Sequence, residues 1–248
     1  MQKQMRNSSQ SAHERQPPAD GRTTVLLTGF GPFPSVPVNA TMMLVPRLAQ
    51  TASRLFPSTR FVHDILATEW ETAPKRVDQL LALHSPDLIL HFGVSSRARG
   101  FEIETRGRNA CVNAQDASGA CPDDTFVSAG GQDLHPSRIP VAEIVRRLRR
   151  KGIAAYQSWN AGTYLCNATL YHVLTSTQGQ TSQAGFVHIP TSLAAPGRLP
   201  SSHMPLRTSP GCPLTWQEAL QGSLEIIATC LDKPSPAMQN ARIGSLKL

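Results

Sequence analysis

Residues 25–29 read VLLTG and residues 87–93 read DLILHFG, and each is a short apolar run that a glycine ends. Runs of this length are typical of buried strands, and the segments between them carry apolar residues at helical spacing. Strands that alternate with helices predict an α/β fold, with a mostly parallel twisted sheet and helices on both of its faces. The expected strands are 25–28, 61–66, 87–92, 154–157 and 185–189, and the expected helices are 41–55, 71–84, 141–151, 163–175 and 215–231.

The length of 248 residues suits one α/β domain with a single core. We expect this domain to span residues 23–232. Segments 1–22 and 233–248 contain prolines and glycines without a sustained period, so they are predicted to be a flexible arm and a flexible tail. Residues 94–135 also lack a clear period, and so long a stretch is typically functional or holds short strands that the pattern hides.

The formal net charge of +7 does not by itself indicate an acidic partner. The densest cations, at 146–151, lie on an expected helix with an apolar stripe, which is typical of a solvated helix face. No nucleic-acid motif accompanies them. No run approaches the roughly 18 apolar residues of a membrane helix, and residues 1–22 lack the apolar core of a secretory signal.

The five cysteines are odd in number and none forms a CxxC pair. This pattern favours neither a disulfide framework nor a zinc site. Cysteines that stay reduced suit a cytoplasmic protein, where they act as core residues or as a nucleophile.

Ligands of parallel sheets bind beyond the carboxyl ends of the strands, which directs attention to the residues after Thr28, Phe92, Gln157 and Val187. Cys166 follows the third of these places. The turn Asn160-Ala161-Gly162 precedes it, and Thr163 is the expected N-cap of the next helix. The first turn of a helix favours a thiolate, so Cys166 is the candidate nucleophile among the five cysteines.

His188 directly follows the expected strand core at Val187 and would face Cys166 as a general base and acid. Glu102 and Glu104 follow the strand that ends near Phe92, and either carboxylate could orient the imidazole as the third member of a triad. The structural alternatives are a core histidine and a salt bridge from Glu104 to a nearby arginine. These residue types alone do not decide between the two glutamates.

Phe30 and Phe33 follow the first strand in the sequence Thr28-Gly29-Phe30-Gly31-Pro32-Phe33. The glycines do not make a phosphate loop, because GxxxxGK[ST] is absent. Two phenylalanines at the mouth of a sheet indicate either an apolar slot for a small flat group or plain core packing.

These segments resemble pyroglutamyl peptidase type I (pyrrolidone-carboxylate peptidase), a family of cysteine peptidases with a three-layer α/β/α sandwich. The likeness spans roughly residues 25–231. It is carried by NAGTYLCN at 160–167, which is similar to the family's AGTxxCN signature, by TGFGPF at 28–33 with Asn39, by FVHIP at 186–190, and by the spacing from Gly93 to Glu104.

The resemblance implies a hydrolase that removes an N-terminal pyroglutamyl residue from a blocked peptide. It makes Cys166 the nucleophile, His188 the base and Glu104 the orienting acid. It implies neither a metal nor a cofactor, and neither a nucleic-acid nor a membrane partner, and it suggests a homo-oligomer, by resemblance a tetramer. It assigns substrate binding to Phe30, Phe33, Asn39, Tyr164 and Leu165.

The sequence also departs from the family pattern. Val94 stands where the family has Gln, Trp159 replaces a small polar residue, and Arg106 and Arg108 enter a segment that is apolar in the family. Two alternatives therefore stand beside the pyroglutamyl peptidase. One is a related thiol amidase with another acyl substrate, and the other is a non-catalytic binding protein on the same scaffold.

Overall fold

A computed structural model describes residues 21–194 and 211–236 of the chain. Eight strands and five α-helices follow one another in it, with a short 3-10 turn at Thr191–Leu193. The strands are β1 (Thr23–Phe30), β2 (Thr59–Leu66), β3 (Leu88–Ser95), β4 (Phe101–Glu104), β5 (Arg106–Arg108), β6 (Leu134–Pro136), β7 (Ala155–Ser158) and β8 (Gln183–Pro190). The helices are α1 (Thr41–Leu55), α2 (Thr72–His84), α3 (Val141–Arg150), α4 (Leu165–Ser176) and α5 (Trp216–Cys230).

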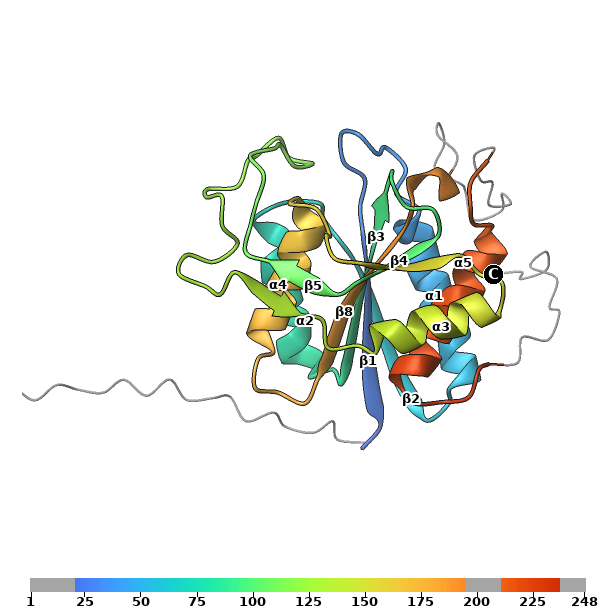
Figure 1. Cartoon of the computed structure of the whole chain (residues 1–248). Helices are drawn as coiled ribbons and strands as arrows, with labels where there is room; N and C mark the ends of the chain where they lie inside the picture. The colour runs from blue at the N-terminus through green and yellow to red at the C-terminus, as the bar shows by residue number, and fades with distance from the viewer. Residues whose placement is uncertain (1–20, 195–210, 237–248) are drawn as a thin grey trace, which may run out of the picture.

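The central sheet has the strand order β2-β1-β3-β8-β4-β7 (Figure 1). The first four of these strands are parallel to one another. β4 runs antiparallel to β8, and β7 is parallel to β4. The prediction of an α/β fold with a mostly parallel sheet is confirmed.

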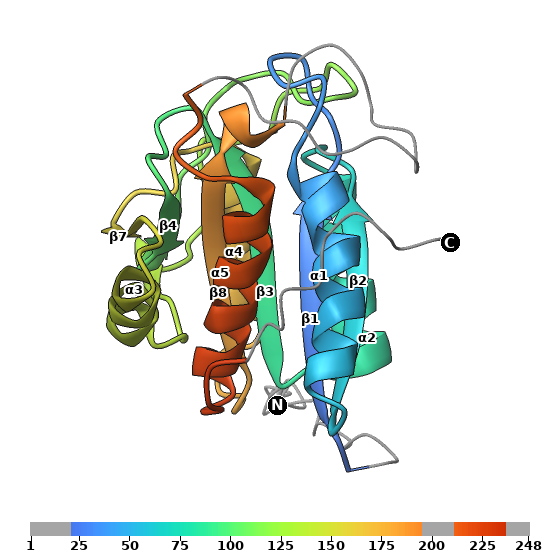
Figure 2. The same cartoon turned by 90° about the vertical axis from the view of Figure 1, so that its right-hand side faces the viewer.

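Helices cover both faces of this sheet, which gives the three layers that the resemblance implied (Figure 2). α1, α3 and α5 bury their apolar residues against one face, together with Val25, Leu90 and Val187. α2 and α4 pack on the other face, where Leu26, Ile89 and Phe186 point. Successive strand residues point to opposite faces, so the unbroken apolar runs serve both cores at once.

The segment 94–135 holds the short strands that hydrophobic period did not reveal. β3 continues through Gly93 to Ser95 because its backbone keeps pairing with β8, so the prediction that Gly93 ends this strand was wrong. β5 and β6 form a separate antiparallel ribbon that lies beside α4 (Figure 1).

The direction of β7 also differs from the prediction. Its carboxyl end near Gln157 was expected at the same sheet edge as those of β1, β3 and β8. Because β7 and β4 run opposite to β8, their chains head away from that edge, and a loop at 159–164 returns the chain to α4.

The predicted arm and tail lie mostly outside the described residues, which exclude 1–20 and 237–248. Within the start of the tail, the Lys233 carbonyl accepts a hydrogen bond from Arg147 at 3.1 Å, and the Ser235 hydroxyl donates to Glu225 at 2.9 Å. Among the described helices, none has the length and apolar content needed to cross a membrane.

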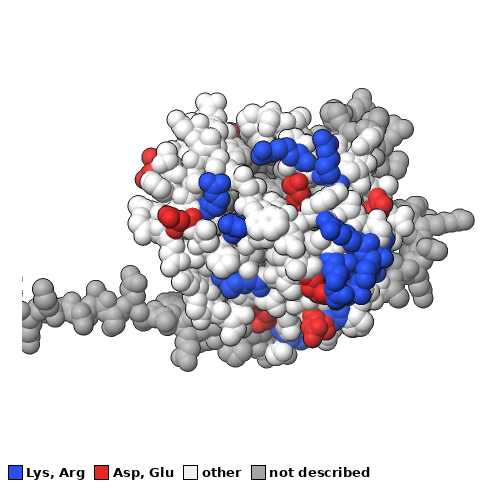
Figure 3. Space-filling model, in the orientation of Figure 1, with Lys and Arg blue, Asp and Glu red and all other residues white. Residues whose placement is uncertain are grey.

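Arginines and a lysine gather over α3, as the space-filling view shows (Figure 3). Acidic side chains of the same domain pair with several of these cations. Arg147 and Lys151 pair with the buried Glu225 at 2.5 and 3.2 Å, and Arg146 pairs with Glu143 at 2.5 Å. The cations of α3 therefore tie it to α5 and to its own first turn.

Candidate active site

Cys166 is the second residue of α4, and its sulfur lies against the backbone of β3. A Cβ added to Gly93 would come 3.1 Å from the Cys166 Sγ and 2.7 Å from the Phe186 ring. Gly93 is also the register partner of His188 on the neighbouring strand β8. A glycine at this position thus lets the Cys166 sulfur approach the sheet beside the histidine.

The start of α4 differs in one detail from the prediction. Thr163 was expected as the N-cap, but the helix begins one residue later, with Tyr164 as an extended N-cap that makes no side-chain capping bond. The Thr163 carbonyl instead accepts a hydrogen bond from the Val112 N–H at 2.8 Å. Because no side chain caps α4, its first-turn N–H groups remain available to a bound group.

His188 forms a short hydrogen bond from its Nδ1 to Glu104 Oε1, at 2.8 Å. His188 is 5% exposed and Glu104 is fully buried, so water does not compete for this contact. Glu102 is the direct register partner of His188, yet it forms no hydrogen bond to the imidazole, and it lies nearer the surface. Of the two carboxylates that the sequence left open, Glu104 is the one that orients the ring.

The electrostatics of His188 depend on its two neighbours. Burial by itself lowers the pKa of the imidazole, but the charge on the Cys166 sulfur and the hydrogen bond to Glu104 outweigh it and raise that pKa to about 10. The arrangement therefore favours the imidazolium form of His188. Burial also raises the pKa of the Glu102 carboxyl, against the charge of His188.

Glu102, Glu104 and His188 bring possible ligand atoms within 4.8 Å of one another, the one such group found in the described parts of the chain. The Nδ1 of His188 is already bonded to Glu104, and Cys166 lies beside the ring. We interpret the group as a carboxylate–imidazole pair beside a thiol.

An aromatic cluster of Phe33, Trp70 and Tyr164 lies next to Cys166. The Tyr164 ring is 5.8 Å from Phe33 and stands edge-on to Trp70 at 5.2 Å between centroids. Burial raises the pKa of the Tyr164 hydroxyl to about 12, and this hydroxyl donates to the Gln115 carbonyl at 3.0 Å. Sequence reasoning missed Trp70, although its place soon after the carboxyl end of β2 was a signal that could have revealed it.

The other predicted binding residues are buried, and they differ in what they contact. Phe30 packs in the core with Phe186, at 6.1 Å between ring centroids, and Leu165 is 1% exposed. Asn39 donates to the Gly31 carbonyl at 3.0 Å and accepts from Thr41, so it fixes the loop that carries Phe33. The structure thus places Phe33 and Tyr164 together, with Asn39 supporting them from below the loop.

Asn167 is a residue of α4, and its side chain binds the segment that follows Glu104. Its side chain accepts from the Arg108 N–H at 2.9 Å and donates to the carbonyls of Arg108 and Ala110 at 2.8 and 2.9 Å. On the next turn, Gly107 packs so closely on α4 that a Cβ would come 2.7 Å from the Tyr171 nitrogen. These contacts hold β5 beside the active site.

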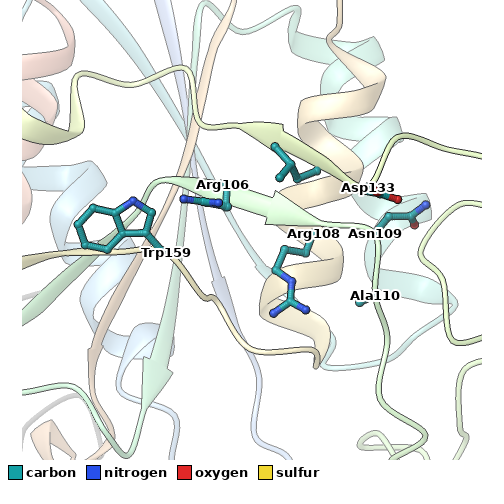
Figure 4. Close-up of a pocket in the computed structure, with 7 residues that line it drawn as sticks. Arg106, Arg108, Asn109, Ala110, Asp133 and Trp159 are labelled. Atoms are coloured by element: carbon teal, nitrogen blue, oxygen red, sulfur yellow. The ribbon is translucent and has the colours of Figure 1, made fainter.

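A pocket of about 450 Å³ lies on the outer side of β5 (Figure 4). Arg106 and Arg108 project from the strand, Trp159 stands on one side, and Asp133 and Asn109 lie on the other. Ala110 and Leu134 complete its lining. Arg106 and Arg108 of β5 thus meet Trp159, which lies far from them along the chain, and all three are departures from the family pattern.

Comparisons with known proteins agree with this geometry. A family model described as pyroglutamyl peptidase matches residues 23–201. A pyrrolidone-carboxylate peptidase of Oceanobacillus iheyensis is 29% identical over 212 residues, which are 84% of this chain and 98% of that protein. Pyroglutamyl-peptidase 1 of Homo sapiens is 30% identical over 171 residues, which are 68% of this chain and 79% of that protein.

Solved structures share the fold. Pyroglutamyl peptidase I from Bacillus amyloliquefaciens superposes with a TM-score of 0.71 at 24% identity, covering 85% of this chain and 98% of that one. A mutant pyrrolidone carboxyl peptidase from Pyrococcus furiosus gives a TM-score of 0.69 at 24% identity, covering 85% and 99%.

Proposed function

This chain belongs to the pyroglutamyl peptidase family, and from that premise we infer that it hydrolyses the amide bond after an N-terminal pyroglutamyl residue. The observation that carries the proposal is the arrangement of three side chains. The Cys166 sulfur lies against Gly93 beside His188, and Glu104 holds the other side of the imidazole at 2.8 Å. This is the geometry of a nucleophile, its base and an orienting acid.

Acylation begins with attack of the Cys166 thiolate on the pyroglutamyl carbonyl carbon. A C–S bond forms, and the carbonyl oxygen takes the negative charge. The first-turn N–H groups of α4, that of Cys166 among them, have no side-chain cap and are the candidate donors to this charge. As the C–N bond breaks, the His188 imidazolium gives its Nε2 proton to the leaving amine, and a thioester remains on Cys166.

Hydrolysis of the thioester reverses these roles. The neutral imidazole of His188 takes a proton from water, and the resulting hydroxide adds to the thioester carbonyl. The C–S bond breaks, pyroglutamic acid leaves, and the thiolate returns beside the imidazolium. Glu104 keeps its hydrogen bond to Nδ1 throughout, so that Nε2 stays directed toward the reacting atoms.

The aromatic cluster suits the blocked residue. A pyroglutamyl ring is small, flat and uncharged, and it has no free amine for an anionic residue to capture. Phe33 and Tyr164 offer it ring faces, and the loop around them is fixed by Asn39 and Thr68, both bonded to the Gly31 carbonyl. Packing of this kind with few polar contacts is typical of a small-molecule site.

The substrate class is tested by comparing fluorogenic amides of pyroglutamic acid and of proline, which differ by the lactam carbonyl and by the charge on nitrogen. We expect the pyroglutamyl amide to be cleaved with a kcat/KM at least about 10³-fold above that of the prolyl amide, because a buried cation without a partner is costly. Equal rates on both amides, or turnover of the prolyl amide alone, would remove the pyroglutamyl assignment.

We also propose that the protein acts in the cytoplasm and forms a homo-oligomer, which the family resemblance suggests to be a tetramer. All five cysteines are free thiols, which supports a reducing compartment. Such a compartment would keep Cys166 available as a nucleophile.

A further inference from the structure

We propose that the pocket of Arg106, Arg108 and Trp159 binds a carboxylate of the peptide on the leaving-group side of the scissile bond. The inference rests on the proposed hydrolysis and adds to it a preference among peptide substrates. The peptidase would favour blocked peptides that carry an acidic side chain, or a free terminal carboxylate, within the first residues after the pyroglutamyl group.

The order of the strands sets the direction in which the leaving group lies. Neighbouring strands run in the order β1, β3, β8, β4 and β7. Phe33 follows β1, the Cys166 sulfur lies on β3, His188 is on β8 and Glu104 is on β4. The acyl group therefore lies toward β1, and the amine that His188 protonates lies toward β4 and β7.

The pocket lies on the segments that follow β4 and β7 along the chain. Arg106 is two residues after Glu104, which is roughly 7 Å along an extended strand. Trp159 directly follows β7, whose last residue pairs with Glu104. The Arg108 backbone is bonded to Asn167, the residue after Cys166. An extended peptide advances about 3.3–3.6 Å per residue, so the first two or three residues after the scissile bond reach roughly 7–11 Å from it.

The two arginines are held with their side chains away from the core. In a strand, alternate residues point to the same side, and Gly107 between them is pressed onto α4. Arg106 and Arg108 consequently share the outward face of β5 and line one pocket (Figure 4). Planar guanidinium groups bind carboxylates through paired hydrogen bonds.

In the part of the chain that the structure describes, the guanidinium groups of Arg106 and Arg108 form no ion pair with an acidic side chain. Within residues 21–194 and 211–236, no carboxylate forms an ion pair with Arg106 or Arg108, whose one side-chain hydrogen bond runs from Arg108 to Asn160 at 3.4 Å. Asp133 lines the same pocket, so two cations face one anion. The local charge balance at the pocket stays positive, and the acidic Glu102 lies outside the pocket as the register partner of His188.

The test measures kcat/KM on matched peptides. The first pair is pGlu-Asp-Ala-Ala-amide and pGlu-Asn-Ala-Ala-amide, and the second pair moves the Asp or Asn one residue further on. A third pair, pGlu-Ala-Asn with a free or an amidated terminus, distinguishes a terminal carboxylate from a side chain. We expect the acidic member of at least one pair to be preferred about fivefold, the upper end for one exposed ion pair, and high salt to reduce the preference.

Three variants connect that preference to the pocket. Arg106→Gln combined with Arg108→Gln should bring the acidic-to-neutral ratio to about one, and Asp133→Asn should raise it about two- to fivefold. Arg146→Gln combined with Arg150→Gln removes the same charge from α3 and should leave the ratio as in the wild type. Because each result is a ratio within one variant, a general loss of activity cancels.

The outcomes separate the two proposals. Cleavage of all peptides with acidic-to-neutral ratios near one in the wild type would overturn the pocket inference alone. A preference for acidic peptides that survives the Arg106/Arg108 double substitution would also overturn it. So would a double variant that changes only in its sedimentation coefficient, because this face would then be a contact between copies of the chain. A wild type that cleaves no pyroglutamyl peptide would overturn the proposed function, and the inference with it.

Discussion

Replacing Cys166 by alanine is expected to lower kcat/KM on a pyroglutamyl amide by about 10⁴-fold or more, to the limit of detection. The substitution removes the atom that forms the thioester, and no other described cysteine lies on β3 or β8 or at the start of α4 to replace it. The fold should persist, because the loss of one half-buried sulfur leaves the packing of Gly93 and Phe186 intact. Fluorophore release measures the activity, and circular dichroism checks the fold.

Cys111→Ala is the matched control for this change. Cys111 is also half-buried, and burial with the nearby Asp124 raises the pKa of its thiol to about 11, which makes it unreactive at neutral pH. The control should retain its activity and its inactivation by iodoacetamide. Turnover by the Cys166→Ala protein within tenfold of the wild type would exclude Cys166 as the nucleophile.

Replacing Glu104 by glutamine is expected to lower kcat/KM by roughly 10³-fold, in the range known for the third member of such triads. The amide is nearly the same size, so the buried site stays filled. However, it carries no charge to stabilise the imidazolium of His188, and it can hold the ring in the wrong tautomer. The same fluorogenic assay measures the loss.

The pH profile of kcat/KM gives this substitution a specific signature. His188 keeps its proton up to a pKa of about 10 because Cys166 and Glu104 raise it. Below that pH the imidazolium can protonate the leaving amine, and above it this ability is lost, so the wild-type profile should fall only at strongly alkaline pH. Glu104→Gln removes one of the raising causes and should move this fall to lower pH.

Glu102→Gln serves as the control because Glu102 is the register partner of His188 but does not bond to it. It should change kcat/KM less than about fivefold, as expected for a partly exposed charge. A larger loss with Glu102→Gln than with Glu104→Gln would reverse the assignment of the orienting acid.

The hydrophobic pattern predicted the fold class because the parallel strands β1, β3 and β8 are long and buried on both faces. Val25–Leu27 and Leu88–Leu90 are nearly inaccessible to solvent, so their composition identifies them directly. The short strands β4, β5 and β6 carry too few residues to show a period, and nothing in a strand's own residues states whether it runs parallel to its neighbour. The reversed direction of β4 and β7 therefore escaped prediction.

The candidate site was predicted to a similar degree. Cys166 and His188 stood out because the sequence places Cys166 in the first turn of a helix and His188 near the carboxyl end of a strand. The choice of Glu104 over Glu102 needed the hydrogen bond to His188, which depends on rotamers and not on spacing. Trp70 and the ribbon of β5 and β6 were missed, since their contacts join segments far apart in the sequence.

Rapid acid quenching of the enzyme during turnover of a pyroglutamyl amide, followed by mass spectrometry of its peptides, tests the central claim most directly. The account predicts one pyroglutamyl group on the peptide that contains Cys166, linked as a thioester that hydroxylamine removes, and none on the Cys166→Ala protein. Its contradiction would be steady turnover with no acyl group on any cysteine, or an acyl group on a residue other than Cys166.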